Sequence, residues 1–384
     1  MAKLPPLVLV VDNSRAVTGA LNAMHHATSP LRAQYDLDFE YVLPSGSTGR
    51  AVLEAQGYVV HELPFVEISR RKADLLRYGP MLLLNGWRLQ RLARQRGAAL
   101  IHLNDFYNLT GYVARLLTGG RLRVITHVRF LPQTQVQVLA KLWRGLAELF
   151  AVRVLCVSEA VRSYFGPLVK VQTVYDPLPG AEQQAAPVVP AARLDGTVRL
   201  LYLSNYIAGK GQNFALEAFR GAHIRQPNLR LHFAGGDMGM EKNQQYRQQL
   251  ESRAEVLGLS AIVTFGGFVT DVETAIKQAD IILNCSESES FSLTCLDALF
   301  YGIPLIASDC GGPAELFESG KSGLLVPNRD VPAMSAAIER LAADPGLRGR
   351  FSAAGRAYVR HKFRPAVTYH RLAEQYRAVW ESVN

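Results

Sequence analysis

The sequence contains few cysteines and no long apolar run. Its four cysteines, Cys156, Cys285, Cys295 and Cys310, form no C-x-x-C pair and have no pair of histidines nearby. Zinc sites and disulfide frameworks depend on such spacings, so we expect free thiols in apolar segments and a reducing compartment. No stretch approaches the roughly 18 apolar residues of a membrane-spanning helix. A membrane span is therefore not expected.

The first apolar stretch, Leu7 to Val11, is only five residues long. A signal peptide needs a longer apolar region, so this stretch predicts a buried strand instead. The same lack of an export signal disfavours a non-catalytic two-domain solute-binding protein. At 384 residues, 48% of them hydrophobic, the chain is too long for one core, and we expect two domains. Neither an internal repeat nor a low-complexity tract is visible.

The positive charge is confined to the first half of the chain. Residues 1–180 hold 21 of the 42 Lys and Arg but only 12 of the 33 Asp and Glu. The remainder is balanced, so the whole net charge of +9 belongs to the first half. This asymmetry favours an anionic ligand or an anionic surface as the partner of that half.

A segment that is both basic and apolar spans residues 65–97. Arg88, Arg91 and Arg94 recur there every three residues and so share a helix face, with Trp87 among the apolar residues between them. Basic amphipathic helices of this kind dock on anionic membranes; the alternative is a solvated helix face that covers a sheet. Nucleic acid is disfavoured because no aromatic stacking platform accompanies the charge. We favour an anionic membrane surface.

The most informative stretch covers residues 281–315. It predicts a buried strand, an acidic loop with Glu287 and Glu289, a helix capped by Ser292, a second buried strand, and a Gly-Gly-Pro turn that opens another helix. Such loops meet at the carboxyl ends of parallel strands, where ligands bind. Both helix starts suit phosphate. Glu289 and Asp297 are eight residues apart and suit two different parts of one ligand, such as a sugar and a ribose.

A second candidate loop, Ser204 to Gly211, follows a predicted strand and precedes a helix that starts at Gln212. Lys210 lies near the start of this helix, where it would place a point charge on a diphosphate. The alternative is a surface lysine with no ligand.

These two stretches resemble the retaining glycosyltransferases of family 4, which have the GT-B fold. The acidic signature corresponds to Glu289-Ser290-Phe291-Ser292 with Asp297 as the second acid, and the family's G-G-x-x-E element corresponds to residues 311–315. Lys210 and Gly211 match the end of the family's G-R-L-x-x-x-K-G loop.

Three positions depart from the family pattern. Asp297 replaces the usual Glu and is one carbon shorter, Ser292 replaces a Gly, and Asn205 replaces an Arg. The last change removes one of the two cations that usually face the leaving diphosphate, so Arg129 or the backbone would have to replace it.

The resemblance implies an α/β fold with two Rossmann-like domains that face each other across a cleft. It implies an acceptor-binding domain at 1–180 with a C-terminal helix at about 366–384, a linker at 181–196, and a nucleotide-sugar-binding domain at 197–365. The likeness covers nearly all of the second half and is loose in the first.

The resemblance also implies roles for individual residues. Glu289 would hold the sugar beside its anomeric carbon, His127 would contact that sugar from the first domain, and Lys210 would stabilise the diphosphate. Gly19 and Arg129 would lie on the acceptor side. The implied donor-binding set is Ser204, Asn205, Lys210, Gly267, Phe268, Val269, Glu287, Glu289, Ser290, Phe291, Ser292, Leu293 and Asp297.

The implied reaction transfers a sugar from a nucleoside-diphosphate sugar to a hydroxyl of a glycan or lipid-linked acceptor, with retained anomeric configuration. Cell-envelope polysaccharide or lipopolysaccharide synthesis, on the cytoplasmic face of the membrane, is the expected setting. Lys210 and helix dipoles would stabilise the departing charge, so neither a cofactor nor a metal is expected. A sugar-nucleotide epimerase and a soluble sucrose- or starch-type synthase on the same fold stay open as alternatives.

Overall fold

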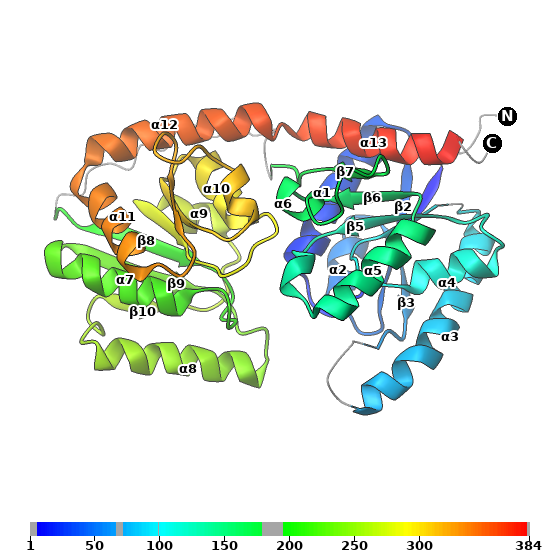
Figure 1. Ribbon diagram of the computed structural model, residues 1–384, viewed down its shortest axis with the longest axis horizontal. Helices are drawn as coiled ribbons and strands as arrows, with labels where there is room; N and C mark the ends of the chain where they lie inside the picture. The colour runs from blue at the N-terminus through cyan, green and yellow to red at the C-terminus, as the bar shows by residue number, and fades with distance from the viewer. Residues whose placement is uncertain (1–5, 67–71, 99, 179–194, 382–384) are drawn as a thin grey trace. The chain divides into compact units, whose positions relative to one another are not determined.

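The computed structural model describes residues 6–66, 72–98, 100–178 and 195–381. The chain divides into two compact units, residues 1–177 with 365–384, and residues 178–364. Each unit is a parallel sheet with helices alternating between its strands (Figure 1), so the predicted α/β class is confirmed. No helix in the described ranges is long and apolar enough to cross a membrane. Most of the predicted linker, residues 181–194, lies outside the described residues.

The sheet of the first unit runs in the order β3-β2-β1-β4-β5-β6-β7. Its strands are β1 (Leu7–Val11), β2 (Asp38–Pro44), β3 (Val59–Leu63), β4 (Leu100–Leu103), β5 (Arg123–Val128), β6 (Arg153–Cys156) and β7 (Val171–Thr173). Its helices are α1 (Gly19–Gln34), α2 (Gly49–Glu54), α3 (Lys72–Arg96), α4 (Thr110–Leu117), α5 (Gln137–Phe150), α6 (Glu159–Arg162), α13 (Pro365–Glu381) and the 3₁₀ turn η1 (Pro132–Thr134).

The strand order of this sheet reverses between β1 and β4. From β1 the chain proceeds to β2 and β3 on one side, and from β4 to β5, β6 and β7 on the other. β1 and β4 are almost wholly buried, as expected of central parallel strands covered on both faces. Ligands bind at such a switch point, beyond the carboxyl ends of the strands.

The C-terminal helix α13 packs on the first unit. The Tyr376 hydroxyl lies 2.8 Å from Nδ1 of His102, and its ring lies edge-on to Phe39. Thr368 Oγ1 donates a hydrogen bond of 3.2 Å to the carbonyl of Tyr175. The last helix therefore completes the core formed by the first strands of the chain.

The sheet of the second unit runs in the order β10-β9-β8-β11-β12-β13, with its switch point between β8 and β11. Its strands are β8 (Val198–Leu203), β9 (Leu229–Ala234), β10 (Val263–Phe265), β11 (Ile281–Asn284), β12 (Leu305–Asp309) and β13 (Leu324–Pro327). Its helices are α7 (Gln212–Arg225), α8 (Glu241–Val256), α9 (Val272–Lys277), α10 (Leu293–Tyr301), α11 (Val331–Ala343), α12 (Pro345–Lys362) and the 3₁₀ turn η2 (Gly312–Glu315).

Several local predictions are confirmed in the second unit. Ser292 caps α10 by accepting from the Cys295 N–H, and Gly302 ends the helix with a φ of 79°. The four cysteines are free and buried, as their spacing predicted. One prediction is wrong: the Gly311-Gly312-Pro313 turn opens only the four-residue 3₁₀ turn η2. The Gly312 N–H, which would be unpaired at a helix start, donates instead to the carbonyl of Glu289. This turn offers no helix start for phosphate.

Candidate active site

An ion pair lies at the switch point of the second unit. Lys210 Nζ is 2.7 Å from Oε1 of Glu289, and their side chains are 30% and 15% exposed. Lys210 belongs to the loop after β8 and Glu289 to the loop after β11, so the two neighbouring strands bring them together. The hydroxyl of Ser286 lies 2.9 Å from the same Oε1 and donates to it. Two predicted catalytic residues are therefore direct partners.

The Lys210 loop is fastened to the loop after β11 through the backbone. The Tyr202 hydroxyl donates to the carbonyl of Lys210 and accepts from the Cys285 N–H at 2.9 Å. Gly211 has a φ of 77°, and a Cβ there would lie 1.8 Å from the carbonyl oxygen of Cys285. Only glycine fits such an approach. The lysine therefore reaches the acidic loop because Gly211 lets the two backbones touch.

The Glu289 loop is held from its other side by the segment after β12. The Glu289 N–H donates to the carbonyl of Cys310, and the Gly312 N–H donates to the carbonyl of Glu289 at 2.8 Å. A Cβ on Gly312 would lie 2.3 Å from the Ser290 carbonyl oxygen. The G-G element thus positions the acidic loop rather than a phosphate.

The residues after Glu289 shape the turn into α10. Ser292 has a φ of 80°, rare for a residue other than glycine, and its Oγ also accepts from Nδ2 of Asn284 at 2.9 Å. Phe291 is buried edge-on against Phe363, whereas Ser290 and Leu293 are partly exposed. Within the predicted donor-binding set, Phe291 and Ser292 therefore act mainly through the backbone they fix.

Asn205, which stands where the family has an arginine, connects neighbouring loops. Its Oδ1 accepts from the Gly236 N–H at 3.0 Å, and its carbonyl accepts from Nε2 of Gln212 at 2.9 Å. Ser204 is held by its N–H, which donates to the carbonyl of Ala234. The amide of Asn205 thus carries no charge for a phosphate, but it fixes the loop that carries Lys210.

Three residues of the predicted donor-binding set, Gly267, Phe268 and Val269, lie in the loop after β10. The Gly267 carbonyl accepts from the Gly235 N–H at 2.9 Å. The Phe268 ring is 74% exposed, and its Cβ would lie 3.4 Å from a Cβ on Gly236. Val269 is partly buried. Phe268 therefore presents an open aromatic face on the same sheet edge as Lys210.

Asp297 lies on α10, and its side chain is partly buried. Oδ1 is buried and makes no hydrogen bond within the described residues. Burial raises the pKa of the Asp297 carboxyl to about 7. A buried carboxyl oxygen without a donor is able to accept hydrogen bonds from a bound group, such as a pair of hydroxyls.

Sequence reasoning missed the partners of Glu287. Arg329, in the loop after β13, pairs with the Glu287 carboxylate, and Nδ2 of Asn328 donates to the Glu287 carbonyl at 2.8 Å. Arg329 adopts a φ of 63°, and left-handed backbone of this kind gathers at functional sites. The Glu287 N–H in turn donates to the carbonyl of Gly209. The loop after β13 thus adds a cation to this edge of the sheet.

In the first unit, His127 lies near the end of β5 and is fully buried. Its ring is edge-on to His102 at 5.4 Å, and Nδ1 lies 3.3 Å from NH2 of Arg129. Burial, followed by the Arg129 charge, holds the pKa of His127 well below its usual value, so the ring is neutral. Nε2 makes no hydrogen bond of normal geometry within the described residues.

Arg129 is the centre of a buried polar network. It pairs with Asp176 at 2.6 Å and donates to Oδ1 of Asn104 at 2.6 Å. Nδ2 of Asn104 donates to Oδ2 of Asp12 at 2.7 Å, across the switch point between β1 and β4. The charge of Arg129 is therefore already balanced. The sequence did not indicate Asp12, Asn104 or Asp176 as its partners.

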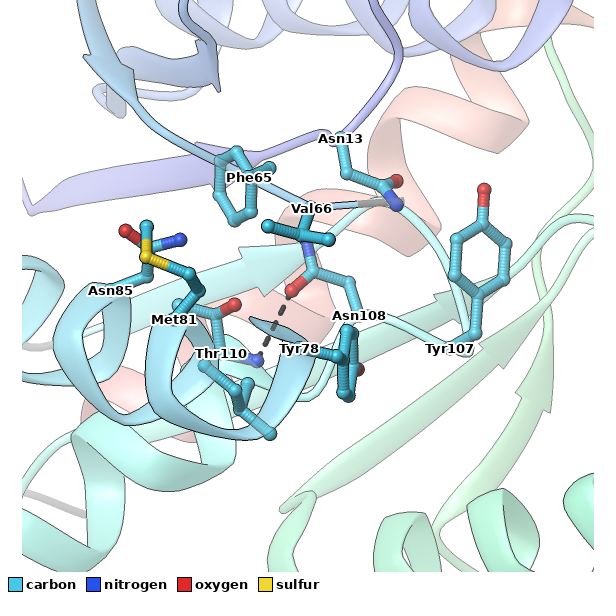
Figure 2. A pocket seen from close by; sticks show the side chains of 10 residues that line it. Asn13, Phe65, Val66, Tyr78, Met81, Asn85, Tyr107, Asn108 and Thr110 are labelled. Atoms are coloured by element: carbon cyan, nitrogen blue, oxygen red, sulfur yellow. Dashed lines mark hydrogen bonds between the residues drawn. The ribbon is translucent and has the colours of Figure 1, made fainter. Parts of the chain in front are cut away.

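Beside this network lie a small cavity and an open groove. The cavity holds about 20 Å³, room for about one water, and Figure 2 shows side chains of α3 and of the loop after β4 around it. The groove, about 620 Å³, is mostly apolar but includes Arg15 and Arg77. Gly19, predicted on the acceptor side, is the exposed first residue of α1, after its cap Thr18. The groove lies beyond the carboxyl ends of β1, β2 and β3.

The second unit matches a family of known activity. Residues 191–358 match the family model described as glycosyl transferases group 1, which is less than half of the chain. HepE of Anabaena, solved in complex with UDP-glucose, superposes with a TM-score of 0.78 over 97% of this chain and 99% of HepE, at 20% identity. The fold is GT-B. At this identity the likeness establishes the GT-B fold and no more.

Curated relatives match part of this GT-B chain. EpsD of Bacillus subtilis is 31% identical over 204 residues, 53% of this chain and 51% of EpsD. The lipopolysaccharide core biosynthesis glycosyltransferase LpsD of Rhizobium meliloti is 34% identical over 117 residues, 30% of this chain and 34% of LpsD. The chain thus spans about half, or less, of the length of these relatives. Among the described residues, no group of three or more His, Cys, Asp or Glu is placed to hold a metal ion.

Proposed function

We propose that this GT-B protein is a retaining glycosyltransferase that moves a sugar from a nucleoside-diphosphate sugar to a hydroxyl of a glycan or lipid-linked acceptor. The observation that carries the proposal is the Lys210–Glu289 pair at the switch point of the unit that matches the group 1 family model. HepE, which shares the fold, was solved with UDP-glucose, and this supports a nucleotide sugar as donor.

The donor would bind across the loops after β8, β10 and β11. Lys210 and the N-terminus of α7 would stabilise charge on the departing diphosphate, and this is where most of the rate enhancement would arise. Glu289 would then hold sugar hydroxyls, and Asp297 the ribose hydroxyls. Arg329 pairs with Glu287 and would add a positive charge to the part of the site that holds the sugar. We propose that this chemistry needs no metal ion, because Lys210 and the helix dipole supply the charge.

The acceptor would bind at the carboxyl edge of the first unit. The groove with Arg15 and Arg77 combines apolar walls with positive charge, which suits an anionic lipid-linked glycan. His127 would contact the sugar through Nε2, the ring nitrogen that makes no hydrogen bond of normal geometry among the described residues. The resemblance of the chain to LpsD supports a role in lipopolysaccharide or other cell-envelope polysaccharide synthesis.

We also propose peripheral attachment to an anionic cytoplasmic membrane surface through residues 65–97. Arg88, Arg91 and Arg94 of α3 are all exposed, and the Arg91 guanidinium lies over the ring of Trp87 at 5.6 Å. Each basic side chain near an anionic bilayer contributes about 1 kcal/mol. Residues 67–71 of this segment lie outside the described residues.

The proposal is tested by thermal unfolding with UDP, GDP, ADP, CMP and dTDP. A ligand at 100 times its Kd adds about 2.7 kcal/mol to the free energy of unfolding, which shifts Tm by several degrees for a domain of this size. We expect a shift with one nucleoside diphosphate and none in the Lys210→Met variant, and sugar transfer from the matching donor should be abolished in Glu289→Gln. Wild-type transfer by Glu289→Gln would refute the assignment.

A further inference from the structure

The helix layer of the first unit carries an apolar patch that the proposed reaction does not use. It comprises Val138, Leu142 and Leu149 of α5, Leu116 and Leu117 at the end of α4, and Val169 in the loop before β7. Each of these six side chains is between 52% and 91% exposed. Apolar side chains are common singly on protein surfaces, but gathered ones mark an interaction site.

The pattern of α5 shows that its exposed apolar residues exceed what the core needs. Ala140, Trp143 and Ala147 form its buried face. Val138, Leu142, Gly145 and Leu149 follow one another at spacings of four, three and four residues, which places them together along a separate, outer stripe. The polar residues are confined to the narrow arc that remains. A helix with only one partner, the sheet, would not need the second stripe.

Ring contacts and hydrogen bonds join the three segments of the patch. The Tyr112 ring of α4 lies 5.9 Å from the Phe150 ring at the end of α5. Lys170, next to Val169, donates to the carbonyls of Glu148 and Ala151 at the same end of α5. Burial lowers the pKa of Lys170, and the nearby charge of Arg115 on α4 lowers it further. Leu116, Leu149 and Val169 therefore belong to one surface.

The rim of this surface is basic. Residues 110–178 contain nine Lys and Arg but only three Asp and Glu, and the three acids are paired: Glu148 with Arg144, Glu159 with Arg162 and Asp176 with Arg129. Arg121 and Lys141 are exposed. Two copies of so positive a surface would repel each other, whereas an anionic bilayer would attract it.

We propose that the apolar patch inserts into the interfacial region of an anionic membrane, with the surrounding basic side chains on lipid phosphates. The apolar side chains would lie at the boundary of the acyl chains, as in other interfacial amphipathic helices. This surface is distinct from the basic face of α3 and supplies the apolar contact that charge alone lacks. The partner it fits is a lipid bilayer, and binding should need both its charge and its apolar interior.

The test is flotation of the full chain with vesicles of phosphatidylcholine alone and of phosphatidylcholine mixed with phosphatidylglycerol, an anionic lipid that gives the vesicle a negative surface potential. The test variant is Val138→Ser/Leu142→Ser/Leu149→Ser. The matched control is Ile224→Ser/Val256→Ser, which changes two similarly exposed apolar residues of the second unit. Thermal unfolding would check that both variants fold like the wild type.

We expect the wild type and the control to bind the anionic vesicles and not the neutral ones. The triple variant should bind at least about tenfold more weakly, because three apolar side chains no longer leave water. Binding of the triple variant at the wild-type level, or no vesicle binding by the wild type, would overturn the proposal. A wild-type dimer that the triple variant converts to monomer in the absence of vesicles would also overturn it, since the patch would then join two copies.

Discussion

Asp297 gives the sharpest prediction, because Oδ1 of its carboxyl is buried and has no hydrogen-bond donor among the described residues. Burial raises its pKa from 3.8 to about 7 in the folded state. The folded protein therefore holds this proton more tightly than the unfolded chain does. Between about pH 4 and pH 7 the folded state binds more protons, so this group makes the free energy of unfolding fall as the pH rises.

The size of the effect follows from the shift. About three pKa units correspond to about 4 kcal/mol at 1.36 kcal/mol per unit, and this is an upper limit because the site can relax and admit water. Asn cannot ionise, so Asp297→Asn removes this contribution. Only the interval from pH 5 to the folded pKa of about 7 contributes to this measurement, so we expect the variant to gain up to about 2.7 kcal/mol over the wild type when the pH is raised from 5 to 8.

The measurement is urea unfolding of the wild type and Asp297→Asn at pH 5, 6, 7 and 8, and the quantity of interest is the difference between the two proteins. Taking the difference cancels other groups in this range, such as Asp105, whose pKa burial also raises to about 7. A difference that stays constant with pH would refute the argument. If Asp297 also holds ribose hydroxyls, the same variant should lose nucleotide-dependent stabilisation.

Three further predictions test the framework of the two units. Asp176→Ala removes the carboxylate that pairs with the buried guanidinium of Arg129. We expect it to lower the free energy of unfolding in urea by about 3–5 kcal/mol. A loss below about 1 kcal/mol would show that the pair is not buried in solution. Gly211→Ala should lower the free energy of unfolding by about 2 kcal/mol or more beyond the effect of Gly209→Ala. Both glycines have a positive φ, but only a Cβ at position 211 would meet another stretch of backbone. Equal effects of the two substitutions on Tm would contradict this. Arg88→Gln/Arg91→Gln/Arg94→Gln should weaken binding to anionic vesicles about a hundredfold, and unchanged flotation would leave α3 as a solvated face.

Local features of the fold were predictable wherever a short stretch determines them. The bounds of β1 agree with the apolar run Leu7–Val11 that predicted it, and the cap at Ser292 and the stop at Gly302 follow from side-chain chemistry and backbone freedom within one turn. The prediction at Gly312 was wrong because a long-range contact, and not the local sequence, determines the backbone there. Its N–H is taken by Glu289, 23 residues earlier in the chain, and no local pattern reveals such a bond.

The candidate site was predictable as a set of loops but not as a set of contacts. Lys210 and Glu289 each stand out through their place after a strand, yet their direct pairing depends on β8 and β11 being neighbours. The partners of Arg129 were missed because Asp176 and Asn104 lie 47 and 25 residues away in the chain, and no local pattern joins them. Arg329 was missed because nothing in an Asn-Arg-Asp turn predicts the distant carboxylate of Glu287.

The two central cations differ in how readily they can turn to a ligand. Arg129 and Asp176 have side chains that are 5% and 9% exposed, and separating such a buried pair costs about 3–5 kcal/mol. Lys210 and Glu289 are partly open to water, where an ion pair contributes only about 1 kcal/mol or less. A diphosphate can therefore share the ammonium of Lys210 at little cost, while Glu289 keeps the hydrogen bond from Ser286. From this difference in burial we expect Arg129 to act structurally and Lys210 to be the cation that a donor engages.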